Sequence, residues 1–279
     1  KVGECMKKRG IAAALALVVV AAMAFVGCSR AADSAHAGEG DALSPIVVGA
    51  DTYPPYVSSD ENGNLVGIDV DILTEAFGRI GYKPDFHIID WERKADLLAA
   101  GDIDCIASCF SMTGRESEYK WAGPYMKSRQ VVAVDPVSDI YTLADLEGKV
   151  VAVQSTTKPE SILLDRTNPR VPEVKNVFSF ADRSYLNPAL IKGYVDAIAA
   201  HETSILSYEQ DYGVQYRILG EPLLEVGLGV AFGNSDDRGI AEALDGTIVD
   251  MLADGTMAEI LSNYFDDPSS FLDVGGLDG

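Results

Sequence analysis

The sequence predicts an α/β fold in which helices cover a largely parallel sheet. From Ile46 onward, short β-branched runs alternate with segments whose apolar residues recur at helical spacing. This alternation is typical of parallel strands joined by helical connections. The chain has 279 residues, of which 47% are hydrophobic. That composition supplies enough apolar material for two modest domains.

The elements of the first part of the chain follow this pattern. Residues 46–50 form a short apolar strand, and residues 69–80 have the acidic start and apolar spacing of an amphipathic helix. The pattern then predicts a strand at 85–89, a helix at 94–100 and a buried strand at 103–109.

The elements of the second part continue the alternation. The predicted strands are 130–134, 149–153, 197–200, 216–219 and 227–231, and the predicted helices are 187–192, 202–212 and 240–252. Thr142 caps a one-turn helix that ends at Gly148, and Gly255 ends the longest helix. Residues 266–279 are interpreted as a loose acidic tail.

One short segment has the features of a carboxylate receptor. Thr113 and Glu116 have the spacing of a capping box, which predicts a helix beginning at Gly114. The first N–H groups of a helix favour an anion, and Arg115 would add a fork-shaped cation in the first turn. The alternative is a capped surface helix whose arginine pairs with Glu116 or Glu118.

Loops that follow strands predict where a ligand binds. In parallel sheets, ligands bind beyond the carboxyl ends of strands, and four loops qualify here: 51–56, 90–91, 111–115 and 155–157. Thr157 and Glu160 form a second capping-box pattern, with Pro159 tolerated in the first turn. Two anion-accepting helix starts, on different lobes, predict a cleft that clamps one carboxylate from both sides.

The N-terminus has the composition of an export signal. A basic segment that begins at Met6, the expected start, precedes the apolar run 11–26. As a helix this run would be about 24 Å long, which is shorter than the hydrocarbon core of a membrane. Residues 1–27 are therefore predicted to be a signal peptide.

The segment after the signal predicts a lipid anchor. Residues 25–28 resemble the bacterial lipobox, in which the cysteine is lipidated, although Phe25 stands where leucine is usual. Lipidated Cys28 and a flexible tether are predicted to occupy residues 28–44, because the segment is rich in Ala, Asp, Ser and Gly and lacks hydrophobic periodicity. This arrangement would hold the folded part outside the cytoplasmic membrane.

Charge and cysteine content exclude several kinds of function. The net charge is −21, and removal of residues 1–27, with four basic residues and one acidic residue, leaves 42 acidic and 18 basic residues and a net charge of −24. Such a chain repels nucleic acid and anionic lipid. Cys105 and Cys109 would lie about 13 Å apart along one strand and are interpreted as buried thiols. No spacing predicts a metal site, and no cofactor is expected.

Seven short motifs occur in a characteristic order between residues 46 and 265. They are Val48-Gly49-Ala50-Asp51 with Tyr53-Pro54-Pro55-Tyr56, Gly67-Ile68-Asp69-Val70-Asp71, Gly101-Asp102-Ile103-Asp104, residues 111–115, Leu146-Glu147-Gly148-Lys149, Val195-Asp196-Ala197, and a final helical hairpin through Tyr264-Phe265. In this order they resemble the amino-acid-binding family of bacterial extracellular solute-binding proteins, which are the receptors of ABC importers.

The resemblance implies a particular α/β architecture. The family has two three-layer α/β lobes joined by two crossover strands, the type II periplasmic-binding-protein fold, and the lobes close on the ligand about a hinge. In this chain the implied lobes are residues 45–130 with 224–279, and residues 131–223. The crossovers would lie near 128–133 and 222–227.

The resemblance also implies roles for individual residues. Arg115 would bind the α-carboxylate of the ligand, helped by the backbone N–H groups of Ser111 and Thr157. The Cys109 carbonyl and the Ser111 hydroxyl would receive the α-ammonium group. Tyr53 and Trp91 would sandwich the side chain of the ligand, since aromatic faces bury apolar stems and attract cationic ends. Five acidic residues are interpreted as structural: Asp69, Asp71, Asp102, Asp104 and Asp196.

One position departs from the family pattern. His201, followed by Glu202, stands where an aspartate commonly binds the ammonium group of the ligand. A neutral imidazole accepts a hydrogen bond but supplies no counter-charge. Either Glu202 or Asp51 binds the ammonium, or the ligand is not an ordinary α-amino acid. A structural His201 that caps the next helix is an equal alternative.

These expectations lead to one preferred function and two alternatives. The preferred function is a monomeric, lipid-anchored, non-enzymatic receptor that captures an amino acid or similar small carboxylate and delivers it to an ABC permease and its ATPase. The first alternative is a dehydratase-like enzyme on the same scaffold, with His201 and Glu202 as an acid–base pair. The second is a sensory lipoprotein.

Overall fold

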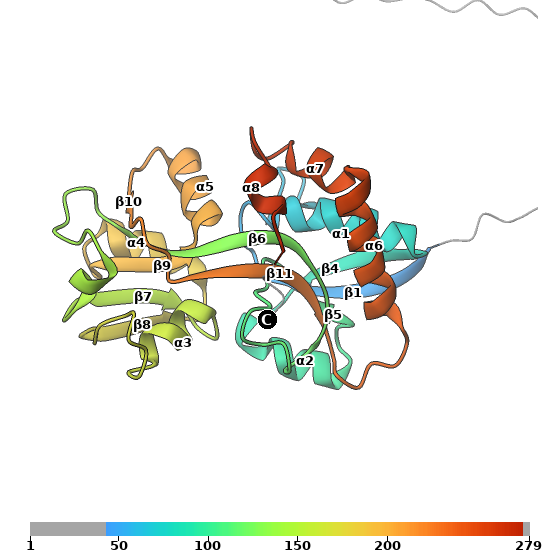
Figure 1. Cartoon of the computed structure of the whole chain (residues 1–279), viewed down its shortest axis with the longest axis horizontal. Coiled ribbons are helices and arrows are strands. Elements are labelled where there is room, and N and C mark those ends of the chain that lie inside the picture. Colours follow the sequence, from blue (N-terminus) through green and yellow to red (C-terminus); the bar gives the residue numbers. More distant parts are fainter. Residues whose placement is uncertain (1–42, 276–279) are drawn as a thin grey trace, which may run out of the picture. The chain divides into compact units, whose positions relative to one another are not determined.

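The computed structural model describes residues 43–275, which all belong to one compact unit (Figure 1). The predicted signal peptide and lipidated Cys28 lie outside the described residues. The strands are β1 Ser44–Ala50, β2 Ser58–Ser59, β3 Leu65–Val66, β4 Tyr82–Ile88, β5 Cys105–Ile106, β6 Lys120–Val134, β7 Val150–Gln154, β8 Asn176–Phe180, β9 Ala197–His201, β10 Arg217–Ile218 and β11 Leu224–Phe232. The α-helices are α1 Ile68–Arg79, α2 Lys94–Ala100, α3 Lys158–Leu164, α4 Leu186–Ile191, α5 Glu202–Tyr212, α6 Ile240–Asp254, α7 Thr256–Leu261 and α8 Ser269–Leu272. Short 3₁₀ turns are η1 Trp91–Arg93, η2 Leu143–Leu146 and η3 Arg183–Tyr185.

Two parallel groups of strands are joined by two antiparallel strands. In the order β4-β1-β5-β11-β6-β9-β7-β8, β1 runs parallel to β4 and β5, and β7 runs parallel to β8 and β9. Between these groups β6 and β11 pair antiparallel and run from one lobe to the other (Figure 1). We name the elements around β1, β4 and β5 lobe 1, and those around β7, β8 and β9 lobe 2. The predicted two-lobe α/β fold is confirmed, while the lobe boundaries at single residues stay predictions.

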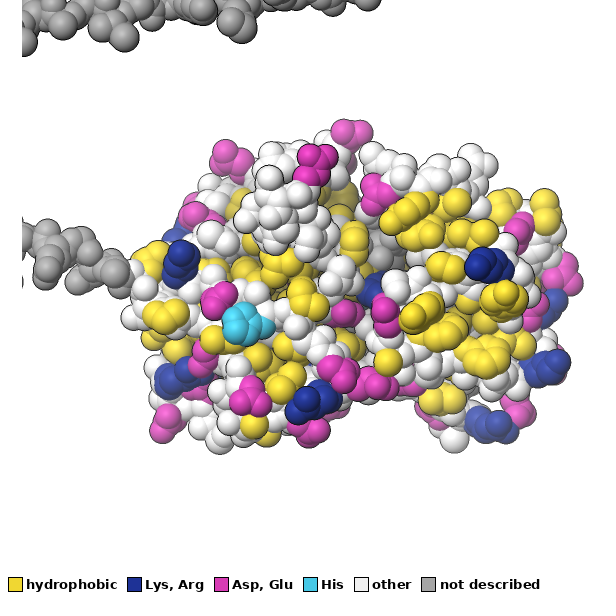
Figure 2. Space-filling view, turned by 180° about the vertical axis from the view of Figure 1, so that it is seen from behind, with side chains coloured by type: hydrophobic (Ala, Val, Ile, Leu, Met, Phe, Trp, Pro, Cys, Tyr) yellow, Lys and Arg dark blue, Asp and Glu magenta, His cyan; other side chains and the backbone are white. Residues whose placement is uncertain are grey.

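Apolar faces of helices hold each lobe together. In lobe 1 the apolar residues of α1 are fully buried and pack with α6 and α7 in one core; they are Ile68, Ile72, Leu73, Ala76 and Phe77. In lobe 2 two cores lie around Val151 and Ala152, adjacent residues whose side chains point to opposite faces of the sheet. Figure 2 shows the lobes side by side, with hydrophobic side chains gathered on lobe 2.

Three predicted elements differ from the structure. The predicted helix at Gly114 is a series of turns, because Gly114 has a left-handed φ of 71° and Arg115 N–H bonds to the Met112 carbonyl. The predicted strand 103–109 is paired only at Cys105–Ile106, since the chain then bends away from the sheet. The predicted loose tail contains α8, whose Phe271 packs on the core of lobe 1.

Strand β8 was not predicted from the sequence. Its side chains are exposed or half-buried in no regular alternation, because it is the outermost strand of lobe 2. Apolar periodicity is weak in such an edge strand, so the segment resembles a loop. In the part of the chain that the structure describes, no helix is long and apolar enough to cross a membrane.

Candidate functional site

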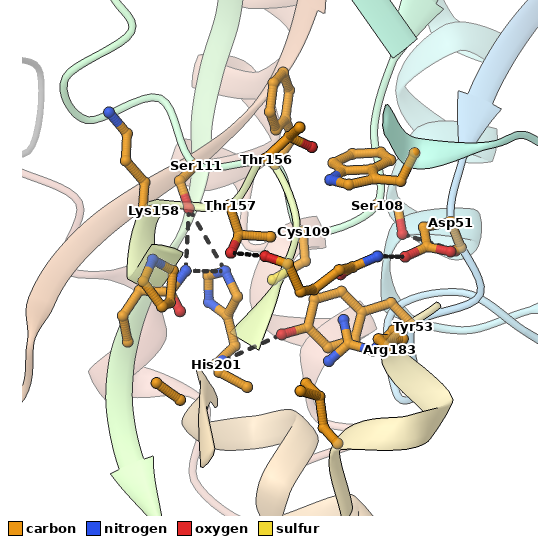
Figure 3. A pocket seen from close by; sticks show the side chains of 18 of the residues that line it. Asp51, Tyr53, Ser108, Cys109, Ser111, Thr156, Thr157, Lys158, Arg183 and His201 are labelled. Carbon is orange, nitrogen blue, oxygen red and sulfur yellow. Dashed lines mark hydrogen bonds between the residues drawn. The ribbon is translucent and has the colours of Figure 1, made fainter. Parts of the chain in front are cut away.

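A pocket that is partly open to solvent lies where the loops of the two lobes meet (Figure 3). Lobe 1 contributes the loops after β1, β4 and β5, and lobe 2 contributes those after β7 and β8. The lining residues are Asp51, Tyr53, Trp91, Ser108, Cys109, Phe110, Ser111, Arg115, Gln130, Gln154, Thr156, Thr157, Lys158, Pro159, Arg183, Leu186, Ala199, Ala200 and His201. The loops therefore meet at the carboxyl ends of the strands, as predicted.

The backbone is strained around this pocket. Among the described residues, the non-glycine residues with left-handed φ values are Ser108, Cys109 and Thr156, at 82°, 55° and 59°. All three line the pocket. Such conformations persist only where the surrounding structure imposes them, and they cluster at functional sites.

Arg115 lies in the pocket and reaches both lobes. Its Nη1 donates to the Ser111 carbonyl at 3.3 Å, and its Nη2 donates to the Thr156 carbonyl of lobe 2 at 3.1 Å. From lobe 2, Lys158 Nζ donates to the Gly114 carbonyl at 2.8 Å. Burial lowers the pKa of Arg115, which still leaves a permanent cation. The predicted pairing of Arg115 with Glu116 or Glu118 is absent from the ion pairs of the described residues.

Helix α3 begins where predicted, without the predicted capping box. Thr157 precedes the first residue of α3, but its hydroxyl donates to the Gln154 carbonyl at 2.6 Å. The Glu160 carboxylate accepts from the N–H of Thr156, one residue before the expected position. These bonds hold the loop that faces Arg115.

Both predicted aromatic residues line the pocket. Tyr53 is buried, its hydroxyl accepts from the His201 backbone N–H at 3.1 Å, and the Arg183 guanidinium stacks on its ring. Trp91 is also buried, and it packs edge-on against Phe110. The two rings therefore come from different loops of lobe 1 to one cavity.

His201 is buried and neutral. Its Nδ1 lies 2.8 Å from Ser128 Oγ, and its Nε2 lies 2.6 Å from Gln130 Nε2, which can only donate. Burial is the largest cause, followed by the charges of Arg183 and Arg115, and together they lower the pKa of His201 to about 3. The structural alternative is wrong in detail, because the His201 side chain makes no capping bond to α5.

Two predicted site residues lie outside the lining. The Glu202 carboxylate accepts two bonds from Arg129 Nη1, at 2.9 and 3.0 Å, and this ion pair replaces the predicted acid–base pair with His201. Thr113 Oγ1 accepts from the Gly227 N–H of β11 at 3.3 Å. Each side chain bonds to a neighbouring strand rather than lining the pocket, and the predicted roles of both residues toward a ligand stay predictions.

Asp51 supplies the one carboxylate among the lining residues. Its Oδ2 accepts from Gln154 Nε2 of lobe 2 at 2.6 Å, and its backbone carbonyl accepts from Ser108 Oγ. Burial raises the pKa of Asp51, while the bond from Gln154 and the charge of Arg183 oppose that rise. Ser111 is also buried, with its hydroxyl 3.4 Å from Gln130 Nε2.

Several lining residues were not predicted from the sequence, chiefly Gln130, Gln154, Lys158 and Arg183. Arg183 follows β8, and it would have satisfied the carboxyl-end rule had that strand been predicted. Gln154 ends β7, one residue beyond the predicted strand. Gln130 lies inside a crossover strand, where no sequence signal separates it from its neighbours.

Asp69 holds the loop of Cys109 from behind the pocket. It is fully buried, its Oδ2 accepts from Cys109 N–H at 2.6 Å, and its Oδ1 accepts from the Tyr125 hydroxyl at 2.9 Å. Burial raises the pKa of Asp69 to about 6 against these hydrogen bonds. Its structural role agrees with the prediction. Cys105 and Cys109 are buried free thiols, as also predicted.

The raised pKa of Asp69 predicts a pH-dependent stability. Because the folded state favours the protonated carboxyl, the stabilisation is complete below pH 4 and is lost as the pH rises through about 6. Relative to the Asp69→Asn variant, the wild type should lose about 2 kcal/mol of unfolding free energy between pH 4 and pH 7. Urea unfolding at each pH measures this difference. Parallel curves for the two proteins would contradict the prediction.

No group of three or more His, Cys, Asp or Glu residues within 43–275 is arranged to hold a metal ion. The lining instead contains the guanidinium of Arg115, neutral hydrogen-bond acceptors and the rings of Tyr53 and Trp91. This set suits a small organic molecule that carries a carboxylate.

Residues 46–267 match the family described as bacterial extracellular solute-binding proteins, family 3. A histidine-binding periplasmic protein of Salmonella typhimurium is 30% identical over 231 residues, which cover 79% of this chain and 87% of that protein. The solved structure of Tv2483 bound to L-arginine has a TM-score of 0.73 and 29% identity, covering 83% of this chain and 95% of that one. The substrate-binding protein of an amino acid ABC transporter has a TM-score of 0.72 and 25% identity, covering 80% of this chain and 100% of that one.

Proposed function

We propose, since this chain belongs to family 3 of the bacterial extracellular solute-binding proteins, that it is the substrate-binding component of an ABC importer. Its ligand is an amino acid or a similar small carboxylate, held between the two lobes. The relatives described as binding histidine or arginine, or as serving an amino acid ABC transporter, support this proposal. The observation that carries it is the position of Arg115 in a pocket lined by both lobes.

The proposed binding mode uses a small set of groups. The guanidinium of Arg115 binds the carboxylate of the ligand through two parallel hydrogen bonds, one to each oxygen. The backbone N–H groups of Ser111 and Thr157 assist it. A donor group on the neighbouring carbon meets the Cys109 carbonyl and the Ser111 hydroxyl. The rings of Tyr53 and Trp91 pack against the remainder of the ligand.

Contacts across the pocket support a closing motion of the lobes. Arg115 of lobe 1 bonds to the Thr156 carbonyl, and Lys158 of lobe 2 bonds to the Gly114 carbonyl. These bonds join loops rather than cores, so they can break without loss of either core. Hinge movement about β6 and β11 then opens and closes access to the ligand.

The proposed cellular setting rests on the N-terminal sequence and on the family. A signal peptide at 1–27 and a lipidated Cys28 with its tether would anchor the protein on the outer side of the cytoplasmic membrane. There it would hand its ligand to a permease driven by an ATPase. The strongly acidic chain remains soluble beside an anionic membrane rather than adsorbing to it.

A ligand screen tests the proposed function. The full-length chain in mild detergent is mixed with amino acids and small carboxylates, and thermal unfolding is recorded. One ligand or a few related ligands should raise the unfolding midpoint, because a ligand at a hundred times its Kd adds about 2.7 kcal/mol of stability. Mass spectrometry should recover that ligand unchanged. Failure of every compound would contradict the proposal, and release of a product would favour the dehydratase-like alternative.

A further inference from the structure

The pocket has an excess of positive charge in an acidic protein. Arg115, Lys158 and Arg183 line it, and Asp51 is the one acidic lining residue. With His201 neutral, the lining carries a formal charge of +2, whereas the whole chain carries −21. Lys94 lies just behind Trp91 and adds a further cation. The local charge therefore opposes that of the surrounding protein.

The basic residues of the pocket have neutral hydrogen-bond partners. Lys94 Nζ donates to Thr156 Oγ1 at 2.7 Å and to the Trp91 carbonyl at 3.1 Å, and Arg183 donates to Ser204 Oγ at 3.3 Å. Arg115 and Lys158 donate to backbone carbonyls. Among residues 43–275, none of these four forms an ion pair within 4.0 Å. By contrast, eight other basic residues do so: Arg79, Lys120, Lys127, Arg129, Lys149, Arg166, Arg170 and Arg238.

This contrast bears on the charge of the ligand. Nearby carboxylates such as Glu118 act on the pocket cations through their charge, but within residues 43–275 none comes within 4.0 Å of Arg115, Lys158, Arg183 or Lys94. Cations in a partly buried site gain most from an anion that enters it, because attraction strengthens as water is excluded. Lys94 is 5% exposed, and burial of its charge costs free energy. An anion bound in the pocket offsets part of that cost by attracting the ammonium group.

The position of Arg183 disfavours a cationic ligand. Its guanidinium stacks on the ring of Tyr53, one of the two aromatic rings proposed to pack against the ligand (Figure 3). Asp51 is the carboxylate that would attract such a side chain. It already accepts a hydrogen bond from Gln154, and the charge of Arg183 lowers its pKa. A positively charged ligand group would therefore meet repulsion from Arg183 and an occupied Asp51.

The end of the pocket near His201 offers neutral acceptors. Gln130 is 2% exposed, and its Nε2 donates to His201 Nε2. Its Oε1 is buried and has no hydrogen-bond partner among the described residues. A buried acceptor without a partner is costly, and a donor on the ligand removes that cost. An amino or hydroxyl group satisfies it without a counter-charge.

From these contacts we propose that the pocket selects a small dicarboxylate with a hydrogen-bond donor beside one carboxylate, in preference to neutral and cationic amino acids. This inference rests on the proposed function and names the ligand class of the same site. Arg115 binds the first carboxylate, and Arg183 faces the second. Gln130 Oε1 joins the Cys109 carbonyl and the Ser111 hydroxyl in accepting from the neighbouring amino or hydroxyl group. Lys158 and Lys94 add long-range attraction.

Two acid–amide pairs test the ligand class. The acid and the amide of each pair have nearly the same shape, but the acid carries one more negative charge. The full-length chain in mild detergent is titrated calorimetrically with L-glutamate and L-glutamine, with L-aspartate and L-asparagine, and with L-arginine. In at least one pair the acid should bind ten times more tightly than its amide and than arginine. 2-Hydroxyglutarate should also bind more tightly than glutarate, which lacks the donor.

A variant identifies the residue responsible. Arg183→Gln should weaken binding of the preferred acid at least tenfold and change binding of its amide less than threefold. Arg166→Gln removes the same charge from an exposed arginine outside the lining, and it should leave both affinities unchanged. If Arg183→Gln unfolds the chain, the acid–amide comparison on the wild type still decides the ligand class.

The outcomes separate this inference from the proposed function. Tightest binding of an amide, of arginine or of another neutral or cationic amino acid in the thermal screen would overturn the dicarboxylate inference and leave the receptor function intact. Absence of binding by every amino acid and small carboxylate would overturn both.

Discussion

Replacing Arg115 by alanine is expected to weaken ligand binding by about 2 kcal/mol or more, roughly 30-fold in Kd. The guanidinium supplies charge-assisted bonds to the ligand carboxylate, and its removal leaves that carboxylate with only the backbone N–H groups of Ser111 and Thr157 as partners. The variant also loses the bond to the Thr156 carbonyl, which joins the lobes, and the bond to the Ser111 carbonyl within lobe 1. Calorimetry with the ligand identified by the thermal screen measures the change.

Two controls separate binding from folding. Arg115→Lys keeps the charge but loses the planar fork, so its affinity should fall between those of the wild type and the alanine variant. Arg166→Ala removes an exposed arginine that pairs with Glu173 outside the pocket, and it should bind as the wild type does. Unchanged affinity in a folded Arg115→Ala protein would reject this residue as the carboxylate anchor.

Replacing Gly67 by alanine is expected to lower the free energy of unfolding by about 3 kcal/mol or more. Gly67 has a φ of 133°, and a Cβ there would lie 2.3 Å from the Tyr56 carbonyl oxygen and 2.7 Å from the Pro55 carbonyl oxygen. Both contacts are with backbone, which cannot rotate away. The same two carbonyls accept from the first N–H groups of α1, so relief of the clash disturbs the helix that carries Asp69. Urea unfolding measures the loss.

Gly78 in the same helix is the matched control. A Cβ added there meets no atom within 4 Å. Gly78→Ala should therefore leave stability unchanged or raise it by up to about 1 kcal/mol, because alanine favours a helix over glycine. Equal effects of the two substitutions would contradict the steric argument for Gly67.

Local sequence patterns predicted most elements of the fold. The helices Lys94–Ala100 and Glu202–Tyr212 have the predicted bounds, and the predicted capping bonds around Thr142 and Asp145 are present. These features depend on residues three or four positions apart, which the chain itself brings together. The predicted helix at Gly114 is absent because that glycine has a left-handed φ of 71°, which lies outside the helical range, and the capping-box spacing does not reveal it.

The candidate site was predicted unevenly for a related reason. Tyr53, Trp91 and Arg115 follow strands, so the rule that loops meet at the carboxyl ends of parallel strands placed them correctly. Their roles toward a ligand stay predictions. Glu202 also follows a strand, but its side chain turned to Arg129 on the crossover strand. His201 was predicted as a site residue from its position in the family pattern. Its neutral state could not be predicted from the sequence, because it depends on burial.

By itself the sequence determined the alternation of strands and helices and the presence of an arginine in a loop beyond a strand. The sequence also showed that His201 stands where the family commonly has an aspartate. All of these features depend on the identity and spacing of residues that are close together in the chain. The pairing of charges depends on the tertiary structure: within residues 43–275, Arg129 pairs with Glu202, whereas Arg183 and Lys94 have no carboxylate within 4.0 Å and bond to hydroxyl groups. Burial and distance set hydrogen bonds and pKa values, and residues far apart in the chain create both.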